Sequence, residues 1–238
     1  MRLDRFLAEC GVGTRSEVKK LIRKGAVSLN GASQSKADAV VLPERDEVFV
    51  FGEKVIYREF IYLMLNKPAG YISATRDGKT PAVLELVPEE HLHFEPFPVG
   101  RLDIDTEGFL LLTNDGDLAH RLLSPKKHIP KTYIAEIEKP VSPEDIEAFS
   151  NGVVLDDGYK TMPAKLTPIS NNSPYLAEIV INEGKFHQVK RMFESVGNKV
   201  LYLKRTKMND LELDENLELG EVRELTEDEL LLLQNTDR

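Results

Sequence analysis

Gly-Arg-Leu-Asp-Ile-Asp-Thr-Glu-Gly occupies residues 100–108, and Phe-Leu-Leu-Leu-Thr follows at residues 109–113. The first stretch is a polar loop bounded by glycines, and the second is an apolar run that predicts a buried strand. Asp103 therefore lies in a loop that leads directly into a rigid element. A carboxylate placed in this way is held more precisely than one on a mobile loop, which makes Asp103 a candidate for a reactive group.

Two common carboxylate sites fit this loop poorly. The spacing of Asp103, Asp105 and Glu107 is that of the start of a calcium-binding EF-hand loop, but that motif needs a glutamate at its twelfth position. Asn114 stands at that position, and a strand is expected in place of the exiting helix, so we reject calcium. A glycoside hydrolase could use Asp103 and Asp105 as its carboxylate pair. Sugar sites favour aromatic platforms, however, and the chain contains no tryptophan.

A third kind of site would use one carboxylate beside a positive charge to attack or deprotonate a nucleoside. The carboxylate stays ionised in a partly desolvated pocket only when a cation lies near it. Candidate cations occur in residues 183–193, which run from a predicted strand through a glycine turn into a helix. Helix starts and clustered bases attract anions. Spacing alone leaves open whether this segment meets Asp103 or forms a basic surface helix.

The composition is that of an ordinary soluble globular protein, with 41% hydrophobic and 30% charged residues in 238. The net charge of −9 is unevenly distributed. Residues 1–40 contain eight Lys/Arg and four Asp/Glu, whereas residues 207–238 contain three and eleven. A basic module at one end and an acidic segment at the other is typical of nucleic-acid-binding chains, although a solvated acidic end without function explains the second equally well.

The number of cysteines and the length of the apolar runs predict the cellular compartment. A single cysteine, Cys10, excludes an intramolecular disulfide and fits a reducing environment. The N-terminal residues lack the apolar core of a signal peptide, and the apolar run at residues 230–233 is too short to cross a bilayer. We therefore expect a cytoplasmic protein without a membrane partner.

The first sixty residues are predicted to form a small module. Thr14 and Glu17 have the spacing of a helix capping box, Gly25 is placed to end that helix, and Asn30-Gly31 predicts a hairpin turn. The helix carries a stripe of bases that can follow a phosphate backbone, although a solvated helix face would also explain it. These bases are Arg15, Lys19, Lys20, Arg23 and Lys24.

From residue 61 onward, short apolar runs and helical patterns alternate without a regular strand–helix–strand repeat. This order predicts an α+β domain with a mostly antiparallel sheet. We expect helices at residues 117–123, 143–151 and 187–196, and strands at residues 62–65, 109–113, 131–138, 153–155, 164–168 and 175–182.

Both parts of the chain resemble known families. The first resembles the S4 RNA-binding domain in Arg2-Leu3-Asp4, Phe6-Leu7, Arg15-Ser16, residues 21–25, Val27 and Asn30-Gly31. The second resembles RNA pseudouridine synthases through five motifs in order: Asn66-Lys67-Pro68-x-Gly70, Arg101-Leu102-Asp103, Lys131-Thr132-Tyr133, Gln188-Val189-Lys190 and Leu201-x-Leu203-x-Arg205. Gly100, the S4-like module and residues 187–193 are similar to the small-ribosomal-subunit branch, the RsuA family.

The resemblance implies a two-domain organisation and an activity. Residues 1–58 would be an S4-like RNA-binding domain, and residues 59–238 a pseudouridine synthase domain with a mostly antiparallel central sheet. The expected reaction is isomerisation of a uridine in 16S rRNA, uridine 516 in the usual rRNA numbering, by a monomer that needs no metal or organic cofactor. The expected partner is 16S rRNA or a small-subunit assembly intermediate. The alternatives are a large-subunit (23S) rRNA synthase and a non-catalytic S4-type RNA-binding assembly factor.

The resemblance also implies roles for individual residues. Asp103 would be the essential carboxylate, Lys190 would keep it ionised and oriented, and Tyr133 would stack on the target uracil. Arg101 would fill the space that the flipped nucleotide leaves, or hold the adjacent phosphate. Candidate phosphate contacts on the catalytic domain are Lys126, Lys131, Lys185, Arg191 and Arg205, and those on the S4-like module are Arg15, Lys19, Lys20 and Arg23.

Overall fold

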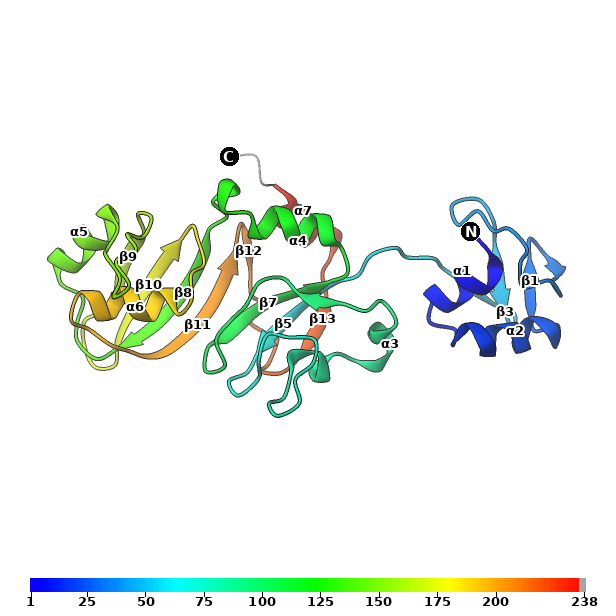
Figure 1. Cartoon of the computed structure of the whole chain (residues 1–238), viewed down its shortest axis with the longest axis horizontal. Coiled ribbons are helices and arrows are strands. Elements are labelled where there is room, and N and C mark those ends of the chain that lie inside the picture. Colours follow the sequence, from blue (N-terminus) through cyan, green and yellow to red (C-terminus); the bar gives the residue numbers. More distant parts are fainter. Residues whose placement is uncertain (236–238) are drawn as a thin grey trace. The chain divides into compact units, whose positions relative to one another are not determined.

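The computed structural model describes residues 1–235. The chain divides into two compact units (Figure 1). Unit 1 comprises Met1–Ile61 and Pro88–Pro96, and unit 2 comprises Tyr62–Val87 and Phe97–Arg238. The domain boundary expected between residues 58 and 59 stays a prediction.

Unit 1 combines short helices with a small antiparallel sheet. The sheet has the order β2-β1-β3-β4. The sheet and the two helices α1 and α2 share one apolar core, in which Phe6 of α1, Ile22 of α2 and Val48 of β3 are buried. The elements are α1 (Leu3–Glu9), α2 (Arg15–Arg23), β1 (Val27–Leu29), β2 (Ala32–Ser33), β3 (Val48–Val50), β4 (Glu53–Val55) and α3 (Glu89–Leu92).

Two local predictions for unit 1 are confirmed. Thr14 Oγ1 accepts a hydrogen bond from the Glu17 amide at 3.3 Å, and the Glu17 carboxylate accepts one from the Thr14 amide at 2.9 Å. This capping box starts α2 because it satisfies amides that the first helical turn leaves unbonded. Asn30 and Gly31 both have positive φ, of 51° and 80°, and they form the hairpin turn between β1 and β2.

Unit 2 is built on a nine-stranded sheet. Seven of the strands lie in the order β13-β5-β7-β11-β8-β10-β9, and the other two, β6 and β12, pair with β7 and β11. Within residues 1–235, β7 and β11 form the one parallel pair of named strands, so the prediction of a mostly antiparallel sheet is confirmed. The strands are β5 (Tyr62–Lys67), β6 (Phe97–Pro98), β7 (Glu107–Thr113), β8 (Lys131–Ile137), β9 (Lys165–Ser170), β10 (Tyr175–Ile181), β11 (Val200–Met208), β12 (Leu211–Glu212) and β13 (Val222–Glu224).

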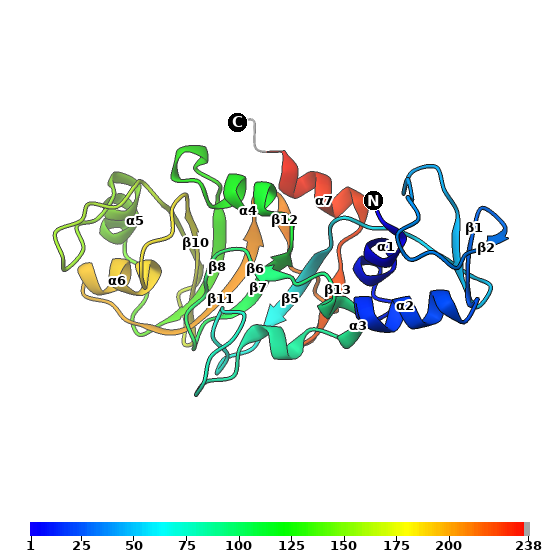
Figure 2. The ribbon, with the colours of Figure 1, turned by 45° about the vertical axis from the view of Figure 1, so that its right-hand side comes forward.

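Helices cover this sheet in two groups (Figure 2). α4 and α7 pack on the β5–β7 part, where Leu118, Leu122 and Leu233 join one apolar core with Phe109. α5 and α6 pack together elsewhere, with the rings of Phe149 and Phe193 5.1 Å apart. The helices of unit 2 are η1 (Val83–Leu86), α4 (Gly116–Leu123), η2 (Pro125–Lys127), α5 (Pro143–Asn151), α6 (Gln188–Ser195) and α7 (Glu227–Gln234).

One predicted strand is wrong. Residues 153–155 form no strand, because this segment turns back on itself and Val154 makes only an isolated bridge with Lys160. The Leu155 amide donates to the Tyr159 carbonyl at 2.8 Å, and the Gly158 amide donates to the Leu155 carbonyl at 2.9 Å. The apolar residues that suggested a strand, Val153 and Leu155, are instead buried on either side of the exposed Val154 in a tight hairpin loop.

The parallel contact between β7 and β11 depends on a glycine. Gly108 lies directly after the Asp103 loop, has a φ of 99°, and pairs with Arg205. A Cβ atom at Gly108 would overlap the backbone oxygen of Arg205. Glycine at this position therefore lets β7 approach β11, the strand that contains Leu203.

We expect Gly108→Ala to destabilise the protein by about 2 kcal/mol more than Gly158→Ala, because only the first substitution overpacks the strand contact. Gly158 is the matched control, since it also has a positive φ, of 81°, but a Cβ there would meet open space. Chemical denaturation of both variants measures the difference. Equal losses of stability would show that the close approach at Gly108 is not required.

Candidate active site

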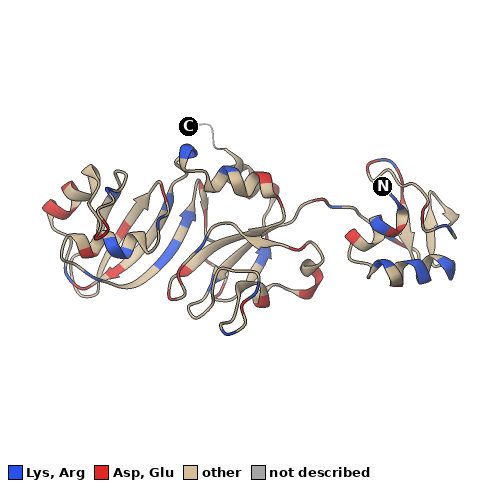
Figure 3. Ribbon diagram, in the orientation of Figure 1, with Lys and Arg blue, Asp and Glu red and all other residues tan. Residues whose placement is uncertain are grey.

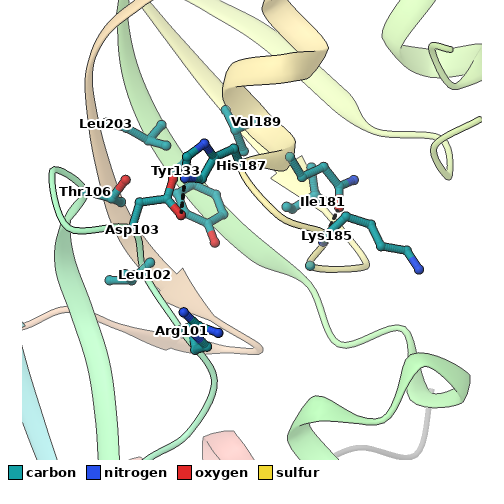
Figure 4. Close-up of a pocket in the computed structure, with 12 residues that line it drawn as sticks. Arg101, Leu102, Asp103, Thr106, Tyr133, Ile181, Lys185, His187, Val189 and Leu203 are labelled. Carbon is teal, nitrogen blue, oxygen red and sulfur yellow. Dashed lines mark hydrogen bonds and ion pairs between the residues drawn. The ribbon is translucent and has the colours of Figure 1, made fainter. Parts of the chain in front are cut away.

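A pocket in unit 2 collects residues from four distant parts of the sequence (Figure 4). The loop before β7 contributes Arg101, Asp103 and Thr106, and β8 contributes Tyr133. The segment that joins β10 to α6 and the strand β11 complete the lining with Ile181, Gly184, Lys185, His187, Gln188, Val189 and Leu203. The loop that contains Asp103 and the basic segment at residues 183–193 therefore line the same pocket, a contact that their spacing in the sequence left open.

Asp103 is paired with a lysine from α6. Lys190 Nζ lies 3.1 Å from Asp103 Oδ2 and 2.5 Å from Asp105 Oδ1, so a single ammonium bridges both carboxylates of the loop. The side chains of Asp103 and Lys190 are 24% and 19% exposed, which limits screening of their attraction by water. The predicted contact between Lys190 and Asp103 is confirmed as a contact.

The charges of this cluster reinforce one another. Burial opposes the charged form of Lys190, but hydrogen bonds to Asp105 and Asp103 outweigh burial and raise its pKa. Burial likewise works to raise the pKa of Asp105, but the hydrogen bond and charge of Lys190 lower it overall. Lys190 is therefore a permanent cation next to Asp103 at neutral pH.

A second lysine holds the backbone of the loop. Lys67, at the end of β5, is fully buried, and its Nζ donates to the carbonyl oxygens of Pro68 at 3.0 Å, Asp103 at 3.1 Å and Thr106 at 2.9 Å. Burial lowers the pKa of Lys67 to about 8, against the opposing influence of Asp105 and Asp103. The loop is thus wrapped around an ammonium group, which fixes the position of the Asp103 side chain.

The segment before α6 is held by a buried carboxylate. Glu183 accepts hydrogen bonds from the Tyr159 hydroxyl at 2.7 Å, the Met162 amide at 2.9 Å and Gln188 Nε2 at 2.8 Å. Gln188 Oε1 in turn accepts from the Lys185 amide at 2.8 Å. These bonds link the hairpin loop at residues 153–161 to the start of α6, and so orient the helix that carries Lys190.

Tyr133 and Arg205 occupy neighbouring positions on paired strands. Tyr133 is only 8% exposed and lines the pocket, as expected for a residue that contacts a bound base. Arg205 is its partner in the β8–β11 register and donates from Nε to the Phe109 carbonyl at 2.8 Å. The role of Tyr133 in stacking on uracil stays a prediction, and its position in the pocket supports that role.

Three residues expected to contact phosphates make contacts within unit 2, and their role in binding phosphate stays a prediction. Lys131 is buried and donates to the Ile129 carbonyl at 2.8 Å, and burial lowers its pKa to about 8. Arg205 is buried against β7. The side chain of Arg191 is 14% exposed and forms ion pairs with Asp156 and Asp157. All three bases are used to hold the unit together, which basic composition alone does not reveal.

Other predicted contacts remain at the surface of unit 2. Arg101 and Lys185 are exposed and line the pocket, and Figure 4 shows the Lys185 side chain extending away from Asp103. Lys126 is exposed on η2, outside the residues that line the pocket. The role of these three residues in binding phosphate stays a prediction.

Bases recur along α2 in unit 1 (Figure 3), and one buried acid holds some of them in place. The Asp4 side chain is fully buried and lies 3.1 Å from Arg2, 3.2 Å from Arg15 and 3.7 Å from Lys19. Burial works to raise the pKa of Asp4, but the hydrogen bonds and charges of Arg2 and Arg15 lower it overall. The ion-paired bases keep about half of their side chains exposed, and Lys20 and Arg23 are also exposed on α2.

Sequence reasoning missed three residues that shape the pocket. Lys67 was part of the Asn66-Lys67-Pro68-x-Gly70 motif but had no role of its own there, because its neighbours in sequence do not indicate that its ammonium is buried. Glu183 has no sequence signal of its own, because its partners are distant. His187 was part of a quoted motif, and the structure places its Nε2 3.7 Å from Asp103 Oδ1.

Among the described residues, no group of three or more His, Cys, Asp and Glu side chains is placed to hold a metal ion. No helix in the same part of the chain has the length and apolar character needed to cross a membrane.

The family is identified by comparison with known proteins. Residues 61–195 match the family model described as RNA pseudouridylate synthase, and residues 1–45 match the S4 domain model. The chain belongs to the RNA pseudouridylate synthase family. It is therefore an enzyme that isomerises uridine in RNA, with an S4 RNA-binding domain at its N-terminus.

Relatives match this synthase over nearly its whole length. An uncharacterized RNA pseudouridine synthase of Bacillus subtilis, YtzG, is 54% identical, with 98% of both chains covered. The ribosomal small subunit pseudouridine synthase A of Escherichia coli is 39% identical, with 97% of this chain and 98% of the relative covered. A crystal structure of a pseudouridylate synthase matches with a TM-score of 0.69 and 39% identity, covering 98% of this chain and 99% of the other.

We expect Lys67→Met to reduce the rate of pseudouridine formation by about 100-fold, because the loop carbonyls lose their donor and Asp103 shifts. The same change should lower the free energy of unfolding by about 2 kcal/mol, since buried carbonyls are left without hydrogen bonds. Single-turnover assays and chemical denaturation measure the two effects. Lys165→Met, at an exposed position on β9 in the same unit, is the matched control. Normal turnover by Lys67→Met would contradict a positioning role.

Proposed function

We propose that this synthase converts one uridine of 16S rRNA, uridine 516 in the usual rRNA numbering, to pseudouridine. The observation that carries the proposal is the ion pair of Asp103 and Lys190 in a pocket that also contains Tyr133. Full-length relatives from Escherichia coli and Haemophilus influenzae, named ribosomal small subunit pseudouridine synthase A, support the choice of RNA, at 39% and 41% identity.

The reaction is an isomerisation with no net oxidation. Asp103 acts at the ribose, as nucleophile or as base, while the C1′–N1 bond breaks. The uracil then turns in the pocket, and C5 bonds to C1′. The C5 proton leaves and N1 takes up a proton, so the atoms balance without an oxidant or reductant. Lys190 orients the carboxylate of Asp103 and places a positive charge beside it, because its ammonium contacts both carboxylates of the loop.

Tyr133 would hold the uracil and complete the reaction. Its ring lines the pocket from β8, where it can stack on the base, and its phenol can assist removal of the C5 proton. The target atoms are inaccessible in a stacked RNA strand, so the nucleotide is flipped into the pocket. Arg101, exposed at the pocket, holds the adjacent phosphate or fills the vacated space.

RNA affinity would come from bases outside the reaction centre. Five bases are exposed and one is half-buried, and all six are available for phosphates. The exposed bases are Arg15, Lys20 and Arg23 of α2 and Lys126 and Lys185 of unit 2, and the half-buried base is Lys19 of α2. Phosphate contacts position the RNA, and the unpaired target region provides specificity. We also propose that the enzyme is a monomer, acts in the cytoplasm and needs no metal or organic cofactor.

We expect Asp103→Asn to reduce pseudouridine formation below about one thousandth of the wild-type rate, because it removes the charge that acts at the ribose. RNA affinity should be unchanged. Asp105→Asn is the matched control: its carboxylate shares Lys190 but is 66% exposed. An exposed ion pair contributes about 1 kcal/mol at most, so this variant should lose no more than about fivefold. Comparable losses in the two variants would remove the special role of Asp103.

Mapping of pseudouridine in ribosomal RNA, from cells with and without the gene, tests the choice of target. We expect one 16S position, uridine 516, to lose its modification when the gene is deleted. It should regain the modification with the wild-type gene and not with the Asp103→Asn variant. Loss at a 23S position instead would favour a large-subunit synthase. An unchanged map would favour an RNA-binding assembly factor.

A further inference from the structure

An aromatic pair projects beside the reaction pocket. Phe186 is 74% exposed, although a large apolar side chain gains most when it is buried. Its ring stacks on the ring of His187, with centroids 3.8 Å apart and an angle of 17° between the planes. His187 lines the pocket, and its Nε2 lies 3.7 Å from Asp103 Oδ1 (Figure 4). The stack therefore extends from the candidate catalytic carboxylate to solvent.

The backbone holds this pair in an unusual conformation. His187 has a φ of 49° and a ψ of 32°, the left-handed region that residues other than glycine enter at a cost. Strained backbone of this kind persists where the surrounding structure enforces it, and it is concentrated at functional sites.

Hydrogen bonds fix both ends of the strained segment. The Lys185 amide donates to Gln188 Oε1 at 2.8 Å, and Arg191 Nη1 donates to the Phe186 carbonyl at 3.4 Å. Arg191 is itself anchored by ion pairs to Asp156 and Asp157. The two rings are therefore arranged before any ligand arrives, which lowers the entropy that binding would cost.

Packing within unit 2 does not account for the exposed ring. His187 covers one face of Phe186, and exposure of 74% leaves the rest of its surface to water. The pocket also presents the exposed cations Arg101 and Lys185. An aromatic face beside a pocket that presents cations matches the chemistry of a single-stranded nucleic acid, in which bases stack and phosphates carry the charge.

We propose that Phe186 and His187 form a stacking platform for the unpaired base next to the target uridine. This inference rests on the proposed function. Flipping the target into the pocket separates it from its neighbour, and the neighbour loses a stacking partner. The platform replaces that partner, so it stabilises the flipped state and favours RNA in which the neighbouring base is unpaired.

The test measures the dissociation constant of the full chain for a synthetic RNA centred on the target uridine. Base stacking on an aromatic residue contributes about 1–3 kcal/mol, so Phe186→Ala should weaken binding by about 5- to 150-fold. Phe186→Trp should restore the wild-type affinity, because its ring also stacks. Ile169→Ala removes an exposed apolar side chain, 54% exposed, from β9 of the same unit and should bind normally. Thermal melting checks that all three variants are folded.

RNAs with an abasic nucleotide directly 5′ or 3′ of the target identify the stacked base. For the wild-type chain, one of these RNAs should bind as weakly as normal RNA binds Phe186→Ala. Phe186→Ala should bind this abasic RNA and normal RNA with the same affinity, because both changes remove the same stacking interaction. Normal binding of RNA by Phe186→Ala would overturn the platform. It would also be overturned if, at both neighbouring positions, the abasic nucleotide and Phe186→Ala together weakened binding by the product of their separate effects.

Pseudouridine formation on the same RNA is measured separately, so the two proposals can fail independently. A wild-type chain that shows the Phe186-dependent binding pattern but forms no pseudouridine would overturn the proposed reaction and support the platform. A chain that forms pseudouridine but binds RNA equally well with and without the Phe186 ring would support the proposed reaction and overturn the platform.

Discussion

The buried ammonium of Lys67 is the interaction on which the reaction pocket depends. It lies at the end of β5 and donates to carbonyl oxygens of Pro68, Asp103 and Thr106. Removing a charge from water is costly, and the lowered pKa of about 8 reflects that cost. Several carbonyl dipoles offset it, and the loop gains a fixed shape in return. The loop is thereby held in place where it enters β7, an interior strand of the sheet.

Once the loop is fixed, its carboxylates need a cation from another part of the chain. Lys190 supplies it from the first turn of α6, where it contacts both Asp103 and Asp105. The position of α6 depends on Glu183, which joins the helix start to the hairpin loop near Tyr159. A buried polar network of this kind holds geometry well because breaking any member leaves another group without a partner.

Local signals in the sequence predicted much of the secondary structure. The Thr14–Glu17 capping box, the Asn30-Gly31 turn and the helix at residues 143–151 each depend on neighbours in sequence, and each is present. The predicted strand at residues 153–155 failed, because a short apolar run fits a buried hairpin loop as well as a strand. Lys131, Arg191 and Arg205 make contacts within unit 2 that their neighbours in sequence do not indicate.

The sequence by itself determined the family, the reactive loop with Asp103, and the motifs that carry Tyr133 and Lys190, because each is a short pattern of neighbouring residues. Only the tertiary structure decided which charges meet. It placed Lys190 on Asp103, turned Lys67 inward, and left the Phe186–His187 stack exposed. The physical reason is distance along the chain. Electrostatic and stacking contacts act over a few ångströms in space, and the residues that make this pocket lie far apart in sequence until the sheet brings them together.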